Sequence, residues 1–104
     1  MTTFDDREQA FEKKFAHDAE MQFKAEARRD KLLALWAAGL MDKPAEELGA
    51  YVTEVIKADM EEAGDEDVYR KLAADLGDRV TEQELRSKMA AFLTEAKAQI
   101  MTES

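Results

Sequence analysis

The sequence predicts an all-α protein, an antiparallel four-helix bundle that follows a mobile N-terminal arm. Apolar residues recur at steps of three and four in successive stretches, and no stretch alternates with the period of two that marks a strand. The chain has only one Pro and four Gly, and three of the Gly stand where helices should stop. Its 104 residues, 45% of them hydrophobic, suit one small core. We therefore expect an arm over residues 1–19 and the bundle over residues 20–104.

The first two helices of the bundle are bounded by Gly and Pro signals. The first begins at about Glu20 and is expected to end near Gly39. Asp42 is the expected N-cap of the second helix, whose first turn contains Pro44, because the missing N–H of Pro costs nothing there. Gly64 is expected to end this helix as its C′ residue. The wide apolar face of the second helix comprises Leu48, Tyr51, Val52, Val55, Ile56 and Met60.

The last two helices are predicted from their N-terminal caps. Asp65 or Asp67 can cap a short third helix that ends at Gly77. Thr81 and Glu84 form a capping box, in which the Thr hydroxyl and the Glu carboxylate satisfy free N–H groups of the fourth helix. The apolar face of the fourth helix comprises Leu85, Met89, Phe92, Leu93, Ala96 and Ile100. Short turns join the four helices, which predicts antiparallel neighbours.

The formal net charge of −9 lies almost wholly after residue 31. Residues 1–31 carry eight acidic and seven basic side chains, whereas the remaining 73 residues carry sixteen and eight. A chain this acidic repels phosphate backbones and anionic lipid, so we expect no nucleic-acid partner and no membrane insertion. The sequence contains neither a signal peptide nor an apolar run of the roughly 18 residues that span a membrane.

The residue types exclude several classes of chemistry. The chain has no Cys and one His, which excludes disulfides, thiolate catalysis and zinc sites built from Cys. The acidic stretch from Asp59 to Asp67 lacks the ligand pattern of an EF-hand loop, and we interpret it as a solvated corner between helices. We expect no metal site, and no catalytic motif supports an enzyme. Trp36 and Tyr51 are expected core residues.

Residues 1–20 carry a narrow stripe of aromatic side chains on a charged segment. Phe4, Phe11 and Phe15 are spaced seven and four residues apart, and Phe23 continues the row. Backbone ordering costs about 1–2 kcal/mol per residue, against roughly 1.5–3 kcal/mol gained for each buried Phe. This balance favours a segment that is disordered when free and becomes helical against a partner. The alternative is that these Phe side chains simply pack back on the bundle.

Two further groups of polar residues are candidates for binding. His17 is most simply a solvated side chain, although an imidazole can also sense pH near neutrality. A phosphotransfer role for His17 is disfavoured because no Lys-Gly follows it. Arg28, Arg29 and Lys31 form a basic group close to many acids, and this group can meet a partner's carboxylates or a nucleotide phosphate.

The order of several long, irregular motifs resembles the zeta subunit, the natural ATPase inhibitor of alphaproteobacterial F-type ATP synthases. The motifs are FDDREQAFEKKFAHDAEMQFKAEARRDKLLALWAAGLM, AYVTEVIKADMEEAGDEDVYRKL and TEQELRSKM, and the similarity covers essentially the whole chain. Ala19 and Gln22 are small departures, at positions where more charge is expected.

The resemblance implies a four-helix bundle whose mobile arm is the inhibitory part. The arm enters a catalytic α/β interface of the synthase head, becomes helical and reaches the γ subunit of the rotor. There it blocks rotation in the hydrolytic direction, whereas rotation in the synthetic direction expels it. The expected protein is therefore a non-enzymatic inhibitor, monomeric when free, cytoplasmic and peripherally associated with the inner-membrane ATP synthase.

With this partner, roles can be assigned to residues of the arm. The expected partner-binding residues are Phe4, Arg7, Phe11, Lys13, Lys14, Phe15 and His17. The three Phe side chains are expected to be buried anchors, because clustered aromatics dominate the binding of a helix in a groove. The basic side chains are expected to pair with carboxylates of the synthase, which sets register and association rate.

Two other functions stay open at this point. One is a helical adaptor that docks a different cytoplasmic partner through the same arm. The other is a regulatory module that binds adenine nucleotide near Arg28 and Arg29. Some members of the zeta family, which this sequence resembles, bind adenine nucleotide weakly. No motif in this sequence supports such binding. No cofactor is expected to be required.

Overall fold

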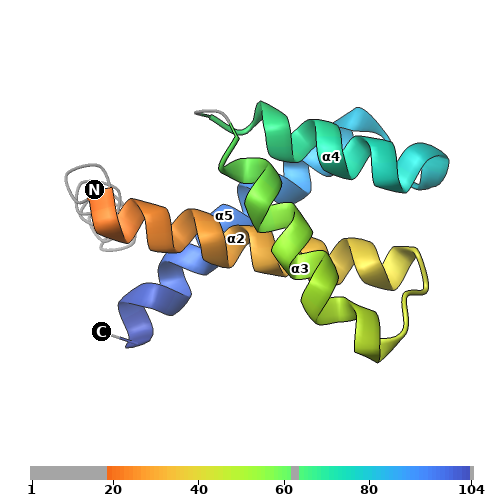
Figure 1. Ribbon diagram of the computed structural model, residues 1–104. Coiled ribbons are helices and arrows are strands. Elements are labelled where there is room, and N and C mark those ends of the chain that lie inside the picture. Colours follow the sequence, from red (N-terminus) through yellow and green to blue (C-terminus); the bar gives the residue numbers. More distant parts are fainter. Residues whose placement is uncertain (1–18, 62–63, 104) are drawn as a thin grey trace.

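The computed structural model describes residues 19–61 and 64–103 as a set of packed helices (Figure 1). Its elements are α2 (Ala19–Leu40), α3 (Ala45–Asp59), α4 (Glu66–Leu76), the short 3₁₀ helix η1 (Gly77–Arg79) and α5 (Glu82–Glu103). Within these ranges there is no β-strand, and each helix runs in roughly the opposite direction to the one before it (Figure 1). The predicted all-α class with four helices is confirmed. Residues 1–18, which hold nearly all of the expected arm, lie outside the described residues.

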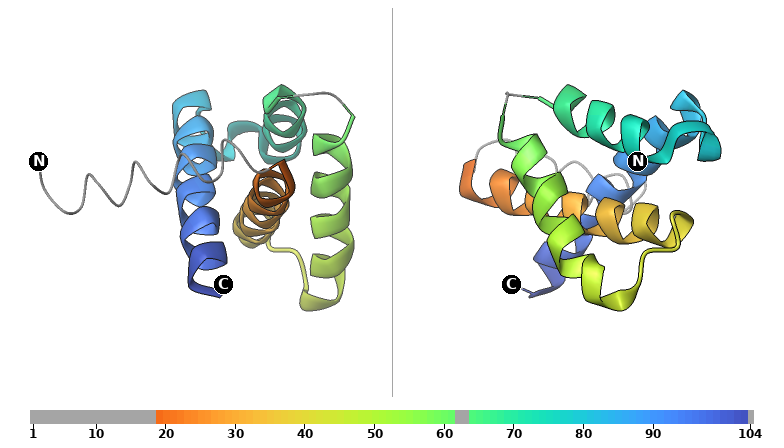
Figure 2. Two further views of the ribbon diagram at one scale, coloured as in Figure 1. Left: turned by 90° about the vertical axis from the view of Figure 1, so that its left-hand side faces the viewer. Right: turned by 45° about the vertical axis from the view of Figure 1, so that its right-hand side comes forward.

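Helix α2 lies at the centre of the molecule and contacts the other three α-helices. In the left view of Figure 2 it lies between α5 on one side and α3 on the other, with α4 above. Small side chains on its inner face let the neighbouring helices approach closely. These fully buried alanines are Ala25, Ala34, Ala37 and Ala38.

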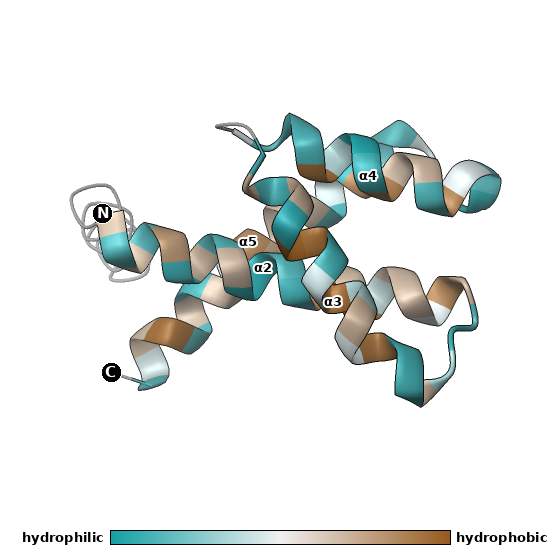
Figure 3. Cartoon of the chain, in the orientation of Figure 1, coloured by the Kyte–Doolittle hydropathy of each residue, from teal (hydrophilic) through white to brown (hydrophobic). Residues whose placement is uncertain are grey.

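The core is built mostly from the apolar faces that the spacing predicts, but Met60, expected on the face of the second helix, follows the end of α3 and is 60% exposed. The hydrophobic residues of α4 lie on the side that faces α3 and α5, whereas its outer side is hydrophilic (Figure 3). The main cluster comprises Leu33, Ala34, Ala37, Ala38, Tyr51, Val55, Val68, Leu72, Leu76, Leu85 and Met89. A second, smaller cluster joins Ala25 of α2 to Ile100 of α5, with Met21, Leu93 and Met101 packed against it.

The turn between α2 and α3 differs from the prediction. Helix α2 continues through Gly39, and the left-handed residue that ends it is Asp42, with φ of 55°. The N–H of Lys43 donates to the carbonyl oxygen of Ala38 at 3.0 Å, which closes a Schellman-type end. A short Asp side chain tolerates this conformation, so Asp42 ends α2. The prediction that it caps α3 is wrong, because the N-cap is Pro44.

The boundaries of the later helices confirm the local signals in part. Helix α3 ends at Asp59, five residues before Gly64, so the predicted end is too late. Gly77 ends α4 with φ of 55°, as expected. The capping box is confirmed: the N–H of Thr81 donates to Oε1 of Glu84 at 3.2 Å, and the N–H of Glu84 donates to the Thr81 hydroxyl at 3.1 Å.

The core assignment predicts unequal effects for two neighbouring leucines of α2. Leu33→Ala is expected to lower the free energy of unfolding by about 2–5 kcal/mol, because Leu33 is fully buried in the main cluster and its loss leaves a cavity. Leu35→Ala, at a 39% exposed position of the same helix, is the matched control and should cost less than about 1 kcal/mol. Urea unfolding followed by circular dichroism measures both values. Equal losses would contradict this core.

Candidate functional site

The residues predicted to bind the partner all precede α2. Phe4, Arg7, Phe11, Lys13, Lys14, Phe15 and His17 lie outside the described residues. The part of the described structure nearest to them in the chain is the first turns of α2. The surface built there, together with the contacts that hold α2 in place, is therefore the candidate site.

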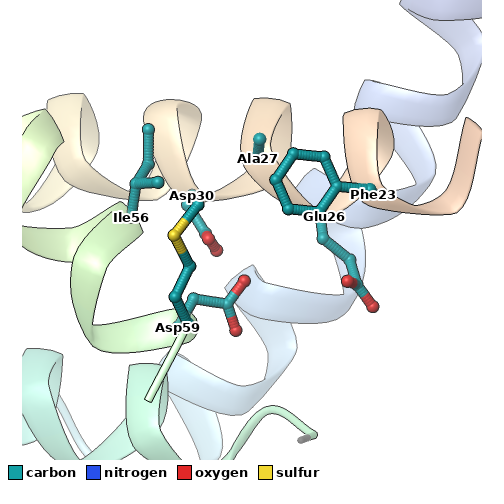
Figure 4. Close-up of a pocket in the computed structure, with 7 residues that line it drawn as sticks. Phe23, Glu26, Ala27, Asp30, Ile56 and Asp59 are labelled. Carbon is teal, nitrogen blue, oxygen red and sulfur yellow. The ribbon is translucent and has the colours of Figure 1, made fainter. Parts of the chain in front are cut away.

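The outer surface of α2 carries an apolar patch next to acidic side chains. Phe23 is 55% exposed, and Met60, the residue after α3, is 60% exposed. Both line one cavity of about 240 Å³ between α2 and the end of α3 (Figure 4). The other lining residues are Glu26, Ala27, Asp30, Ile56 and Asp59. We call the seven lining residues the Phe23 patch.

A buried guanidinium lies behind this patch. Arg29 is only 1% exposed, and three carboxylates from different parts of the chain surround it. Its Nε donates to Oδ1 of Asp30 at 3.1 Å, and its Nη1 donates to Oδ1 of Asp65 at 2.8 Å. Its Nη2 donates to Oδ2 of Asp59 at 3.4 Å. The Arg29 cluster therefore ties α2 both to the last residue of α3 and to the residue before α4.

The charges of this cluster stabilise the ionised guanidinium. Burial alone lowers the pKa of Arg29, but the hydrogen bond to Asp65 and the charges of Asp30, Asp65 and Asp59 outweigh it and raise the pKa. Removing one partner of a buried ion pair leaves an uncompensated charge, at a cost of about 3–5 kcal/mol. The cluster is thus a strong constraint on how the three segments are arranged.

Asp30 is the member of the cluster whose protonation is most strongly perturbed. Its side chain is fully buried, its Oδ2 accepts no hydrogen bond, and the carboxyl groups of Asp30 and Asp59 point toward one another (Figure 4). Burial raises the pKa of Asp30 to about 8. The hydrogen bond to Asp59 and the charge of Asp59 act in the same direction, against the charge of Arg29. Asp30 therefore keeps its proton to a higher pH than an ordinary Asp side chain does.

These contacts correct two interpretations of the sequence. The basic group at residues 28–31 is not uniformly exposed, because Arg29 faces the interior. The acidic stretch from Asp59 to Asp67 is not merely a solvated corner, since two of its carboxylates, Asp59 and Asp65, bind Arg29. One signal was available: Arg29 stands one turn from both Ala25 and Leu33, and so on the buried face of α2.

A basic surface lies on the other side of Phe23. Lys24, Arg28 and Lys31 line a neighbouring cavity of about 680 Å³ together with Glu103, and this cavity shares Phe23, Ala27 and Ile56 with the Phe23 patch. The Arg28 guanidinium donates to both carboxylate oxygens of Glu103, at 2.6 and 2.9 Å, and to Oε1 of Gln99 at 3.1 Å. These bonds fasten α2 to the last turns of α5.

The two large aromatic residues assigned to the core behave differently. Tyr51 is buried, as predicted, and its hydroxyl donates to Oδ2 of Asp75 at 2.8 Å, which joins α3 to α4. Trp36 lies at the margin of the core and meets the ring of Phe92 edge-on, with 6.4 Å between ring centroids. Neither ring lines the Phe23 patch.

Neither a group suited to a metal ion nor a membrane-spanning helix is found within residues 19–61 and 64–103. No group of three or more His, Asp or Glu side chains in these ranges is placed to hold a metal ion. No helix in the same ranges is long and apolar enough to cross a membrane.

Comparison with known proteins identifies the family. The family profile described as ATPase inhibitor subunit zeta matches residues 1–99, which include both the arm sequence and almost the whole helical part. The chain belongs to the ATPase inhibitor subunit zeta family. The resemblance seen in the sequence motifs is thereby confirmed, and a zeta-family chain is an inhibitor of ATP synthase, a regulatory protein and not an enzyme.

A solved structure supports the zeta-family fold. A protein whose structure was determined by solution NMR is 52% identical in sequence, with a TM-score of 0.73. The match covers 81% of this zeta-family chain and 99% of that chain. A comparison with curated proteins gives no match.

The protonated state of Asp30 predicts how the stability of this zeta-family protein depends on pH. The folded chain keeps the Asp30 proton up to about pH 8, whereas the unfolded chain loses it near pH 4. The folded state therefore binds more protons between these values. The free energy of unfolding should fall there as pH rises, by at most about 1.4 kcal/mol per pH unit, and level off above pH 8. Asp30→Asn should flatten this fall between about pH 5 and 8.

Asn is a suitable replacement because its carbonyl oxygen can still accept from Arg29 while its amide donates to Asp59. Urea unfolding at a series of pH values, for wild type and variant, measures the difference. Asp78→Asn, at an exposed position of η1, is the control and should leave the wild-type slope in place. If Asp30→Asn keeps the full wild-type slope, Asp30 does not hold the proton.

Proposed function

We propose that this zeta-family chain inhibits ATP hydrolysis by inserting residues 1–19 at a catalytic α/β interface of the F-type ATP synthase. The arm becomes helical there, reaches γ and blocks rotation in the hydrolytic direction, whereas rotation in the synthetic direction expels it. The observation that supports this proposal is the family match, because it extends from residue 1 through the arm sequence and does not begin at the bundle.

The helical part supports separate roles for the arm and the bundle. The chain passes from residue 18 directly into α2, which the Arg29 cluster fastens to α3 and α4 and the Arg28–Glu103 pair fastens to α5. A helix held on two sides can serve as a rigid base for the segment before it. In the proposal, the arm supplies the affinity and the bundle supplies this base.

The affinity that inhibition requires is within reach of the arm. A micromolar complex needs about −8 kcal/mol of net binding free energy. Each buried Phe contributes roughly 1.5–3 kcal/mol, so Phe4, Phe11 and Phe15 can approach this value after a few kcal/mol of ordering cost. Pairs between the basic residues of the arm and synthase carboxylates add association rate.

The proposed partners are the α, β and γ subunits of the synthase head, and the free inhibitor is proposed to be a cytoplasmic monomer that associates peripherally with the inner-membrane enzyme. No cofactor is proposed to be required. The geometry near Arg28 and Arg29 does not favour the nucleotide-binding alternative, because both guanidinium groups bind carboxylates of this chain. An adaptor for another partner would need the same arm, and a pull-down that recovers α and β subunits distinguishes it from the inhibitor.

Deletion of residues 1–19 is expected to abolish inhibition and to leave a folded bundle. The deleted segment contains every proposed anchor, whereas the clusters around Leu33 and Ala25 lie wholly after it. ATP hydrolysis by the isolated synthase head, assayed with full-length and shortened protein, measures inhibition, and circular dichroism measures folding. Inhibition retained by the shortened protein would falsify the assignment of the arm.

Phe11→Ala combined with Phe15→Ala is expected to weaken inhibition by about tenfold or more, because two buried anchors are lost. The melting temperature should not change if neither ring belongs to the bundle core. The same hydrolysis assay and a thermal melt provide the two readouts. Gln9→Ala combined with Glu12→Ala, on the same arm, is the matched control and should have a small effect. A fall in melting temperature of the Phe variant would show instead that the aromatic stripe packs on the bundle.

A further inference from the structure

We propose that the contact surface for the synthase continues past the arm onto the Phe23 patch, and that this patch receives a partner segment carrying apolar side chains and a Lys or Arg. This inference rests on the proposed function. It adds a second contact surface, on the folded part of the chain, and it specifies the chemistry of the surface that the synthase presents there.

Exposure of large apolar side chains is concentrated at this patch. Phe23 and Met60 are the two most exposed large hydrophobic residues of the described ranges, ahead of Leu40 at 41% and Leu35 at 39%. A single exposed apolar side chain is ordinary, but these two come from different helical segments and line the same cavity. Aromatic residues and Met are enriched in protein interfaces, where a hollow between them accepts an anchor from the partner.

The patch is held in place before any partner binds. Phe23 lies on α2 and Met60 directly follows α3, and Arg29 of α2 joins the two segments by binding Asp59, the residue before Met60. A surface fixed in this way loses little conformational freedom on binding, so more of the contact energy is retained as affinity.

The charges around the cavity specify a cationic partner side chain. Glu26 and Asp59 line it together with the apolar residues and the buried carboxyl of Asp30, whose pKa is raised, and no basic residue is among its described lining residues. The apolar wall fits the aliphatic stem of a Lys or Arg, and the carboxylates of Glu26 and Asp59 fit its charged end. The exposed ring of Phe23 offers a further favourable position for a cation over its face.

The neighbouring basic surface fixes the orientation of such a partner. Lys24 and Lys31 lie on the opposite side of Phe23, where they line the second cavity. A segment that crosses Phe23 therefore meets acidic groups on one side and basic groups on the other. This arrangement favours one direction of docking and disfavours the reverse direction.

The occupant is the synthase because of where the patch lies in the chain. Phe23 is the fifth residue of α2, about 6 Å along the helix axis from Ala19, and Ala19 is the last residue of the proposed arm. A partner that holds the arm up to its last residues is within reach of Phe23. A second copy of this chain is a poorer occupant, since its net charge of −9 repels an acidic patch.

The test uses full-length protein and a pair of matched double variants. Phe23→Ala with Met60→Ala removes the apolar part of the patch, and Leu35→Ala with Leu40→Ala removes two exposed side chains from the other half of α2. The first variant should weaken inhibition of the isolated synthase head about tenfold, with a melting temperature within about two degrees of wild type. The second should change inhibition less than about threefold.

A charge variant tests the second half of the inference. Glu26→Gln keeps the shape of the side chain and removes one carboxylate from the rim of the cavity. We expect a slower association with the synthase head, measured as the rate at which hydrolysis is lost after mixing. The difference from wild type should shrink as salt is added, because exposed charges are screened. A rate unchanged at low salt would overturn the cationic partner.

The outcomes separate this inference from the proposed function. If the wild-type protein does not inhibit, both fail. If the wild type inhibits, deletion of residues 1–19 abolishes inhibition and Phe23→Ala with Met60→Ala leaves it unchanged, the function stands and the contact ends at the arm. If sedimentation shows a wild-type dimer that the same double variant dissociates, the patch belongs to a second copy and the inference is overturned.

Discussion

The arrangement of this small bundle depends on one buried guanidinium, that of Arg29. A guanidinium that is 1% exposed has lost its bound water and needs other hydrogen-bond and charge partners. Asp30, Asp59 and Asp65 provide these partners from three segments. Because Asp59 is the last residue of α3 and Asp65 directly precedes α4, the cluster fixes the end of α3 and the start of α4 against the middle of α2. Packing of apolar faces alone would tolerate more than one such arrangement.

The cluster also lies at a boundary within the core. Along α2, Ala25 belongs to the small apolar cluster shared with α5, and Leu33 belongs to the main cluster, with Arg29 one turn from each. A proton on Asp30 reduces the repulsion among three closely placed acids, so one guanidinium and one proton offset two of the three negative charges. The polar cluster therefore links two apolar regions that do not form one continuous core.

Local rules predicted much of the fold, and tertiary contacts explain where they failed. The capping box at Thr81 and the helix end at Gly77 were predictable because both depend only on residues nearby in sequence. Asp65 is the N-cap of α4, as predicted, but its side chain does not cap the helix, and the role of Asp42 was not predictable. The role of an Asp depends on what its carboxylate or backbone meets. The turn gave Asp42 a left-handed conformation, and Arg29 bound the Asp65 carboxylate. The exposure of Phe23 also depends on how α3 crosses α2, which spacing cannot show.

The proposed function gives the position of the Arg29 cluster a mechanical meaning. A segment that stops a rotor must pass the load into something stiff, and the described structure offers an unbroken helix from Ala19 to Leu40 that is fastened on two flanks. The fastening points, Arg28 and Arg29, are the tenth and eleventh of the 22 residues of α2 and lie near its middle. The half of α2 nearer the arm also packs on α5 through the small cluster of Ala25 and Ile100. The polar contacts therefore fix α2 between its two apolar clusters, so that the helix following the arm is held along its length.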